Sequence, residues 1–236
     1  MIPLRDDQPS SQRPLMTWAL IAINVALFLY ELMLGERLEP FLMQAAFVPA
    51  KLFGGGGAPG GDLQVDNALL SMFLHGGWAH IGGNMLFLWI FGDNVEDRLG
   101  HFRFTVFYLL CGFIASYAHA FANPHSGMPA VGASGAIAGV LGAYLYLFPR
   151  ARVLTAVVLG FYVSTVAVPA LVYLPIWFLL QLISGVAAIG RTSAETQAGG
   201  VAFWAHIGGF VAGPVVLLLL GGRRRPQQPA LRQPWS

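Results

Sequence analysis

Six long apolar stretches constrain the fold of this chain more than any other sequence feature. A transmembrane helix needs about 20 mainly apolar residues to cross the core of a bilayer. Stretches near that length lie at residues 16–34, 104–122, 168–189 and 201–220, and two shorter ones lie at 78–92 and 134–148. Hydrophobic residues make up 56% of the sequence and charged residues only 10%, a balance that excludes an ordinary soluble domain. The sequence therefore predicts an all-α membrane protein, a bundle of six transmembrane helices.

The segment between the first two stretches differs in kind from the rest of the chain. Residues 35–77 combine a short apolar patch with the run GGGGAPGGD, so this long connector is expected to lie on the membrane surface rather than to cross it. The bundle itself is assigned to residues 16–221. It is flanked by an N-terminal tail at 1–15 and a basic C-terminal tail at 222–236.

The distribution of positive charge predicts the orientation. Most of the 13 Lys and Arg residues fall in the two tails and in the loops after the second and fourth stretches. Only Arg37, Lys51 and Arg191 fall in the remaining loops. Because cytoplasmic loops carry the excess of Lys and Arg, both termini are expected in the cytoplasm. The scattered charge and the net charge of +2 argue against a nucleic acid partner.

A few polar side chains stand inside the apolar stretches, where they are costly and usually functional. His80 and Asn84 lie near the start of the second stretch, Ser134 begins the fourth, and His206 lies near the start of the sixth. With both termini inside, these three stretches run in the same direction, from the outer face inward. The four side chains are therefore expected to share one depth close to the outer surface.

Small residues offer a means of bringing Ser134 and His206 together. Gly135 with Gly139, and Gly209 with Gly213, form GxxxG pairs that allow two helix backbones to approach closely. The second pair also lies on the helical face of His206. Such pairs are common packing motifs in any polytopic membrane protein, so they do not identify a function by themselves.

Together these residues indicate a serine nucleophile with a histidine base. A serine hydroxyl needs a neighbouring base to remove its proton, and an imidazole within hydrogen-bond reach is sufficient. No Asp or Glu lies in the expected outer half of a span, so a dyad of Ser134 and His206 is predicted instead of a triad. His80, Asn84 and the backbone N–H of Ser134 are candidate donors to the oxyanion.

Each of these residues also has an ordinary structural interpretation. Ser134 could cap a helix, and His206 could form an interhelical hydrogen bond. His75 and His80 could bind a metal, but no third ligand stands at matching depth, so no metal and no cofactor is predicted. The single Cys111 lies in an apolar run and is expected to be a buried, inert thiol.

The segments HGGWAHIGGNMLFLWIFGDNVEDRLG, GASGAIAG and AHIGGFVAG resemble the three signature motifs of the rhomboid intramembrane serine proteases. The resemblance implies hydrolysis of peptide bonds in or next to transmembrane segments of membrane protein substrates within the lipid bilayer. It implies an acyl-enzyme on Ser134, with His206 as the base and with His80, Asn84 and the Ser134 amide as oxyanion donors. Gly132 would line the substrate site.

The same resemblance assigns further positions. Trp177 and Phe178 are similar to bulky residues that face the second span, where substrates enter sideways, and His75 resembles a histidine that organises the connector. Ala138 replaces a tyrosine that stacks on the catalytic histidine in some relatives. We expect a bacterial inner-membrane protein with its active site near the outer face. The alternatives are a non-catalytic rhomboid-like protein that binds membrane clients, and a small channel or transporter.

Overall fold

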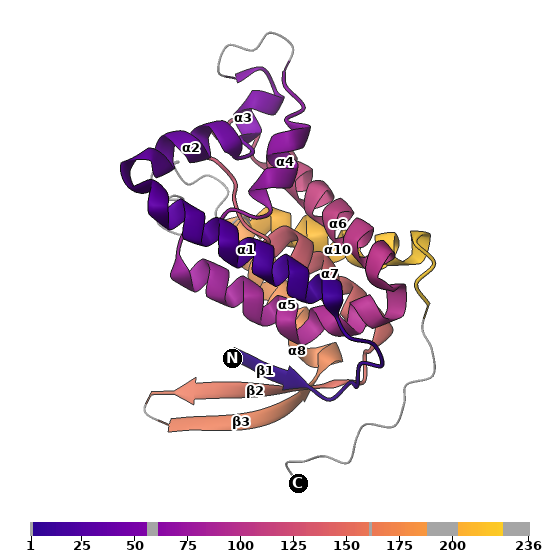
Figure 1. Ribbon diagram of the computed structural model, residues 1–236. Coiled ribbons are helices and arrows are strands. Elements are labelled where there is room, and N and C mark those ends of the chain that lie inside the picture. Colours follow the sequence, from indigo (N-terminus) through magenta and orange to yellow (C-terminus); the bar gives the residue numbers. More distant parts are fainter. Residues whose placement is uncertain (1, 56–60, 161, 188–202, 224–236) are drawn as a thin grey trace.

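Helices form most of the chain in the computed structural model, which describes residues 2–55, 61–160, 162–187 and 203–223 (Figure 1). The six main helices are α1 (Leu15–Leu34), α5 (Trp78–Leu99), α6 (His101–Ala122), α7 (Ser134–Leu147), α8 (Ala170–Ala187) and α10 (Phe203–Leu219). Each begins within a few residues of a predicted apolar stretch. Ile189, Val201 and the tail from Arg224 lie outside the described residues. The positions of the helices therefore agree with the prediction.

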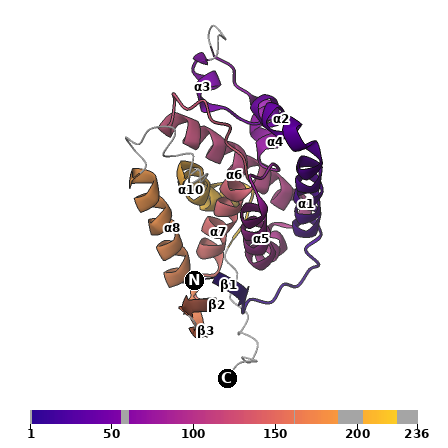
Figure 2. The ribbon, with the colours of Figure 1, turned by 90° about the vertical axis from the view of Figure 1, so that its left-hand side faces the viewer.

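Helix α7 lies at the centre of the bundle, with α5, α6, α8 and α10 around it and α1 on the outside of α5 (Figure 2). Most side chains of α7 are buried, from Gly135 to Tyr144 and again at Leu147. A helix that is apolar on all sides is stable only when its neighbours cover it completely. The Gly and Ala residues of SGAIAGVLGA allow those neighbours to approach closely.

A three-stranded antiparallel sheet covers one end of the bundle, and the all-α prediction is wrong in this respect. Strands β1 (Ile2–Asp6), β2 (Arg152–Leu159) and β3 (Tyr162–Pro169) pair in the order β1-β2-β3. Strands β2 and β3 are rich in β-branched residues and form a hairpin at Gly160, whose φ is +62°. The fifth helix consequently begins at Ala170, after β3, and β1 occupies part of the predicted N-terminal tail.

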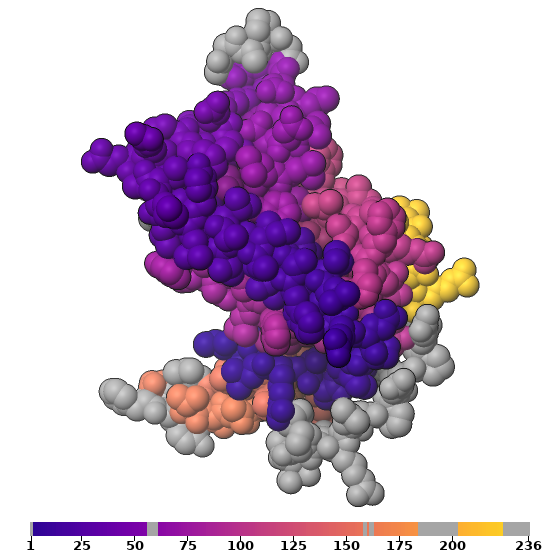
Figure 3. Space-filling view, in the orientation of Figure 1, coloured from indigo at the N-terminus to yellow at the C-terminus, as the bar shows by residue number. Residues whose placement is uncertain are grey.

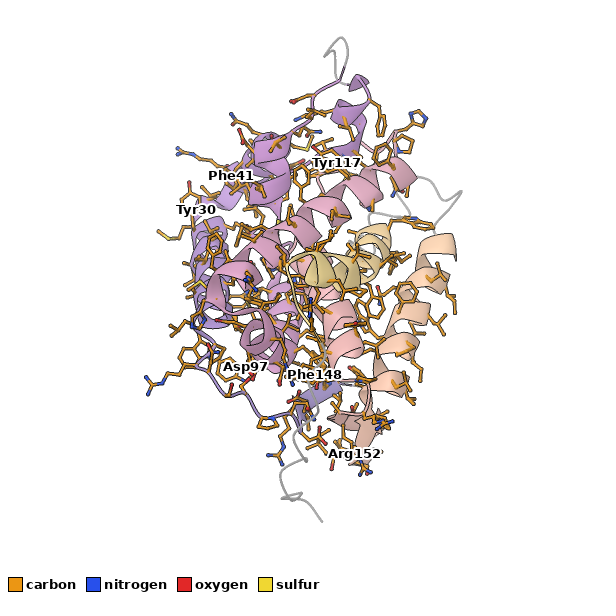
Figure 4. The ribbon with its side chains drawn as sticks, turned by 90° about the vertical axis from the view of Figure 1, so that its right-hand side faces the viewer. Tyr30, Phe41, Asp97, Tyr117, Phe148 and Arg152 are labelled. Atoms are coloured by element: carbon orange, nitrogen blue, oxygen red, sulfur yellow. The ribbon has the colours of Figure 1, made fainter. Side chains whose placement is uncertain are left out.

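The connector between α1 and α5 lies at the opposite end from the sheet (Figure 1). It contains a 3-10 turn (Gly35–Arg37) and the short helices α2 (Leu38–Ala45), α3 (Pro49–Leu52) and α4 (Val65–Ser71). The buried side chain of Gln64 holds this segment together, because it bonds both the N–H and the carbonyl of Val48. Figure 4 shows the two ends, with Tyr117 beside the connector and Arg152 at the sheet.

Large apolar side chains remain exposed on the outer helices. In Figure 3 the indigo side chains of α1 cover much of the face turned to the viewer, and Leu29, Leu32 and Met33 are among its exposed residues. By length and composition, two stretches of the described chain could cross a membrane, Leu15–Ala45 and His101–Ala122. The apolar helices α7, α8 and α10 are shorter, and α5, although it has 22 residues, is not one of the two stretches, so six crossings and a surface connector stay a prediction.

Candidate active site

The two GxxxG pairs form the contact between α7 and α10. A Cβ built on Gly209 would lie 2.0 Å from the carbonyl oxygen of Gly135, and one built on Gly213 would lie 2.1 Å from that of Gly139. No side chain larger than hydrogen fits at these positions. Because the contacts advance together along both helices, α7 and α10 run in the same direction, and the expected close approach is confirmed.

This packing brings Ser134 and His206 to the same level of the bundle. Ser134 is the first residue of α7, and His206 lies in the first turn of α10. A Cβ built on Gly135 would lie 3.7 Å from both the Cβ and the carbonyl oxygen of Ala205, so residues next to the pair are in contact. No hydrogen bond joins Ser134 Oγ to His206 in the described residues. Such bonds are often long before substrate binds.

His80 and Ser134 lie on either side of Gly132, in the loop that leads into α7. A Cβ built on Gly132 would lie 2.7 Å from Nε2 and Cε1 of His80, and 3.6 Å from Ser134 Oγ. The φ of Gly132 is +130°, in the region that favours glycine. The N–H of Gly76 donates to Nδ1 of His80 over 3.5 Å, so Nε2–H is left to donate toward the loop.

Asn84 follows His80 by one turn of α5 and is held by His75. Its Nδ2 lies 3.0 Å from Nε2 of His75, and the backbone N–H of His75 donates to both carboxylate oxygens of Glu31 at 3.1 Å. Burial lowers the pKa of His75 to about 4, and the nearby His80 adds to this effect. The neutral His75 can therefore accept from Asn84. No hydrogen bond between Asn84 and Ser134 occurs among the described residues.

The described side chain that hydrogen-bonds the His206 ring is one that the sequence analysis missed. Oε1 of Gln181 on α8 lies 2.7 Å from Nδ1 of His206. Gln181 is a polar residue in the middle of the apolar run LPIWFLLQLISG. The rule that polar groups inside membrane helices are functional, which selected His80 and Ser134, would have found it too.

The structure separates the two aromatic residues expected to face the second span. The Trp177 ring lies 6.4 Å from Phe87 of α5 and 5.7 Å from the ring of His206, measured between centroids. The Phe178 ring instead packs on Phe210 of α10 at 4.8 Å. Successive residues of a helix point in different directions. Among the ring contacts of the described residues, only that of Trp177 reaches α5 from α8, and the expectation for Phe178 stays a prediction.

A small cavity of about 20 Å³ adjoins Ser134. Ser71, His119, Gly132 and Ala205 are among the residues that line it. A cavity needs roughly 10–15 Å³ to hold one water molecule and polar neighbours to bind it. This space therefore has room for a single water next to the serine.

Comparison with known proteins gives a family match over most of the chain. The model described as "Rhomboid domain" matches residues 62–223. "Rhomboid protein 1, mitochondrial" of Saccharomyces cerevisiae is 32% identical over 146 residues, which cover 59% of this chain and 38% of the yeast protein. The "Rhomboid protease GluP" of Bacillus subtilis is 44% identical over 79 residues, or 34% of this chain and 15% of that protein.

A human relative gives a similar result. "Presenilin-associated rhomboid-like protein, mitochondrial" of Homo sapiens is 36% identical over 86 residues, which cover 36% of this chain and 23% of the human protein. The matched part is therefore well under half of the length of each of these three relatives.

Proposed function

Because the chain belongs to the rhomboid family, whose model matches residues 62–223, we propose that it is an intramembrane serine endopeptidase. Its substrates are membrane proteins, cleaved in or next to a transmembrane segment. A relative named as a rhomboid protease, in Bacillus subtilis, supports this proposal. The observation that carries it is the convergence of His80 Nε2 and Ser134 Oγ on Gly132, at the level where α10 presents His206.

In this proposal Ser134 and His206 perform the covalent chemistry. Ser134 Oγ attacks the carbonyl carbon of the scissile bond while Nε2 of His206 takes the hydroxyl proton. The tetrahedral intermediate then expels the amine, which receives that proton from His206, and an ester to Ser134 remains. A water molecule then attacks the ester carbonyl while His206 takes its proton. The second tetrahedral intermediate releases the new carboxyl terminus of the substrate, and the serine oxygen receives the proton back from His206.

Three donors stabilise the oxyanion of both tetrahedral intermediates. Nε2–H of His80 and Nδ2–H of Asn84 come from α5, and the backbone N–H of Ser134 has no partner within α7 because it opens that helix. Gly132 leaves the space that the substrate carbonyl needs between His80 and Ser134. This arrangement uses only side chains and backbone groups of the chain.

Membership of the rhomboid family implies that the chain is a membrane protein. We further propose the following topology. Six helices cross the bilayer, α5, α7 and α10 run inward from the outer face, and the sheet lies with both termini on the cytoplasmic side. The exposed apolar side chains on α1 and α8, such as Leu32 and Ile183, support contact with lipid. Two of the three relatives are named as mitochondrial and one comes from Bacillus subtilis, so the comparisons do not favour the expected bacterial inner membrane.

Labelling with a serine-directed fluorophosphonate tests the proposed nucleophile. The wild-type protein in detergent is expected to be labelled on Ser134, and both Ser134→Ala and His206→Ala should abolish labelling. If wild type and Ser134→Ala are labelled equally, the proposal fails. A wild-type protein that binds a transmembrane peptide but is neither labelled nor able to cleave it would instead support the non-catalytic, client-binding alternative.

A further inference from the structure

We propose that Gln181 is a positioning residue that holds the ring of His206 in the form a general base requires. The inference rests on the proposed protease function and deepens it. A base must keep a lone pair on the ring nitrogen that faces the nucleophile, and the other nitrogen must carry the hydrogen. Serine enzymes with a triad use a carboxylate for this purpose. None of the described carboxylates hydrogen-bonds His206.

The hydrogen bond from His206 to Gln181 selects one tautomer. Oε1 of Gln181 lies 2.7 Å from Nδ1 of His206, and an amide oxygen can only accept a hydrogen bond. Nδ1 therefore carries the hydrogen, and the lone pair resides on Nε2. His206 is 8% exposed, so bulk water does not provide this contact. Gln181 thus performs the orienting task of the missing carboxylate.

A second contact from α8 fixes the plane of the ring. Trp177 precedes Gln181 by four residues, so the two side chains lie on one face of α8. The Trp177 and His206 rings have a centroid distance of 5.7 Å and an interplanar angle of 36°. Gln181 thus bonds the edge of the imidazole while the Trp177 ring lies beside it in a tilted arrangement, and both residues come from α8.

Helix α7 offers no aromatic ring to His206 from position 138, which is an alanine. Ala138 stands where some relatives are expected to have a stacking tyrosine, and a Cβ built on Gly209 would lie 3.3 Å from the Cβ of Ala138. The aromatic and polar supports of His206 are both on α8.

Two substitutions of Gln181 and one control test the role. Gln181→Met preserves the length of the side chain but removes the acceptor, whereas Gln181→Glu keeps an acceptor. Leu180→Met, at a neighbouring exposed position of α8, is the control. Cleavage of a transmembrane model substrate should show kcat lowered about 10- to 100-fold in Gln181→Met, with KM changed less than about twofold. Leu180→Met should match wild type.

The pH dependence separates positioning from a general structural role. Gln181→Glu should retain most of the activity and shift the acid limb of the pH–rate profile to higher pH, because a carboxylate stabilises the protonated imidazole. Wild-type kcat in Gln181→Met, or an unshifted profile in Gln181→Glu, would overturn the inference while leaving the protease function intact. A wild-type protein no more active than Ser134→Ala would overturn both.

A measurement on the wild-type protein tests the inference even if the variants do not fold. Nitrogen NMR of the wild type with labelled histidine reports which ring nitrogen of His206 carries the hydrogen. The inference requires hydrogen on Nδ1 and a bare Nε2 at neutral pH. Hydrogen on Nε2 in the resting protein would overturn it, whatever the variants do.

Discussion

The carboxyl group of Asp6 in β1 accepts a hydrogen bond from the hydroxyl of Tyr144 near the end of α7. Asn94 of α5 donates to the same carboxyl oxygen over 3.2 Å, and β1 pairs with β2 along its length. The first residues of the chain therefore connect the ends of α5 and α7 to the hairpin that precedes α8.

Burial of the Asp6 carboxyl predicts a pH dependence of stability, and the hydrogen bond from Tyr144 opposes this effect only in part. Burial raises the pKa of Asp6 to about 7, and the neighbouring Asp93 and Asp7 add to this effect. Because the folded state binds the proton more tightly than the unfolded state, the contribution of Asp6 to stability falls as the pH rises from about 4 to about 7. Between about pH 5.5 and about pH 8.5, the loss is on the order of 2 kcal/mol.

Unfolding of the detergent-solubilised protein at these two pH values measures the effect. Asp6→Asn keeps an acceptor for Tyr144 but does not titrate, so its stability should depend less on pH than that of the wild type. Equal pH dependence in the two proteins would show that the Asp6 carboxyl is not responsible.

Substitution of Gly209 should disrupt the contact between α7 and α10. In Gly209→Ala the new Cβ would lie 2.0 Å from the carbonyl oxygen of Gly135, so the helices must separate. We expect a loss of roughly 2 kcal/mol or more in unfolding free energy and loss of activity. Gly83→Ala on α5 is the control, since a Cβ there meets nothing within 4 Å. Thermal unfolding that affects both variants alike would contradict the proposed role of this contact.

Substitution of Gly132 should lower the catalytic rate more than it lowers the stability of the fold. A methyl group there meets the His80 ring at 2.7 Å, on a backbone with φ of +130°. We expect Gly132→Ala to lower kcat by at least about 100-fold, as loss of one oxyanion donor does. The helix content measured by circular dichroism should equal that of the wild type. Gly127→Ala, in the same loop and with open space around it, should be as active as wild type.

The positions of the helices could be predicted because long apolar runs identify them directly. The relative level of Ser134 and His206 followed from two further facts, the alternating direction of successive spans and the glycine pairs. The contacts of Gly135 with Gly209 agree with both. Helix position and helix direction are therefore encoded in local patterns of the amino-acid sequence.

The features that were missed depend on contacts between distant segments. The sheet forms because β1 reaches a hairpin about 150 residues away, and sequence order alone does not show that pairing. Gln181 could have been selected as a polar residue in an apolar run, but its contact with His206 depends on how α8 and α10 pack, and no local pattern predicts that packing. The ring contact of Phe178 with Phe210 likewise depends on how α8 and α10 pack.

Proteolysis in reconstituted liposomes tests the proposed protease activity most directly. A purified transmembrane model substrate is incubated with wild type, Ser134→Ala or His206→Ala, and the products are identified by mass spectrometry. We predict cleavage in or beside the transmembrane segment by wild type and none above background by either variant. Cleavage by Ser134→Ala at the wild-type rate would contradict the assignment of Ser134 as the nucleophile and, with it, the proposed function.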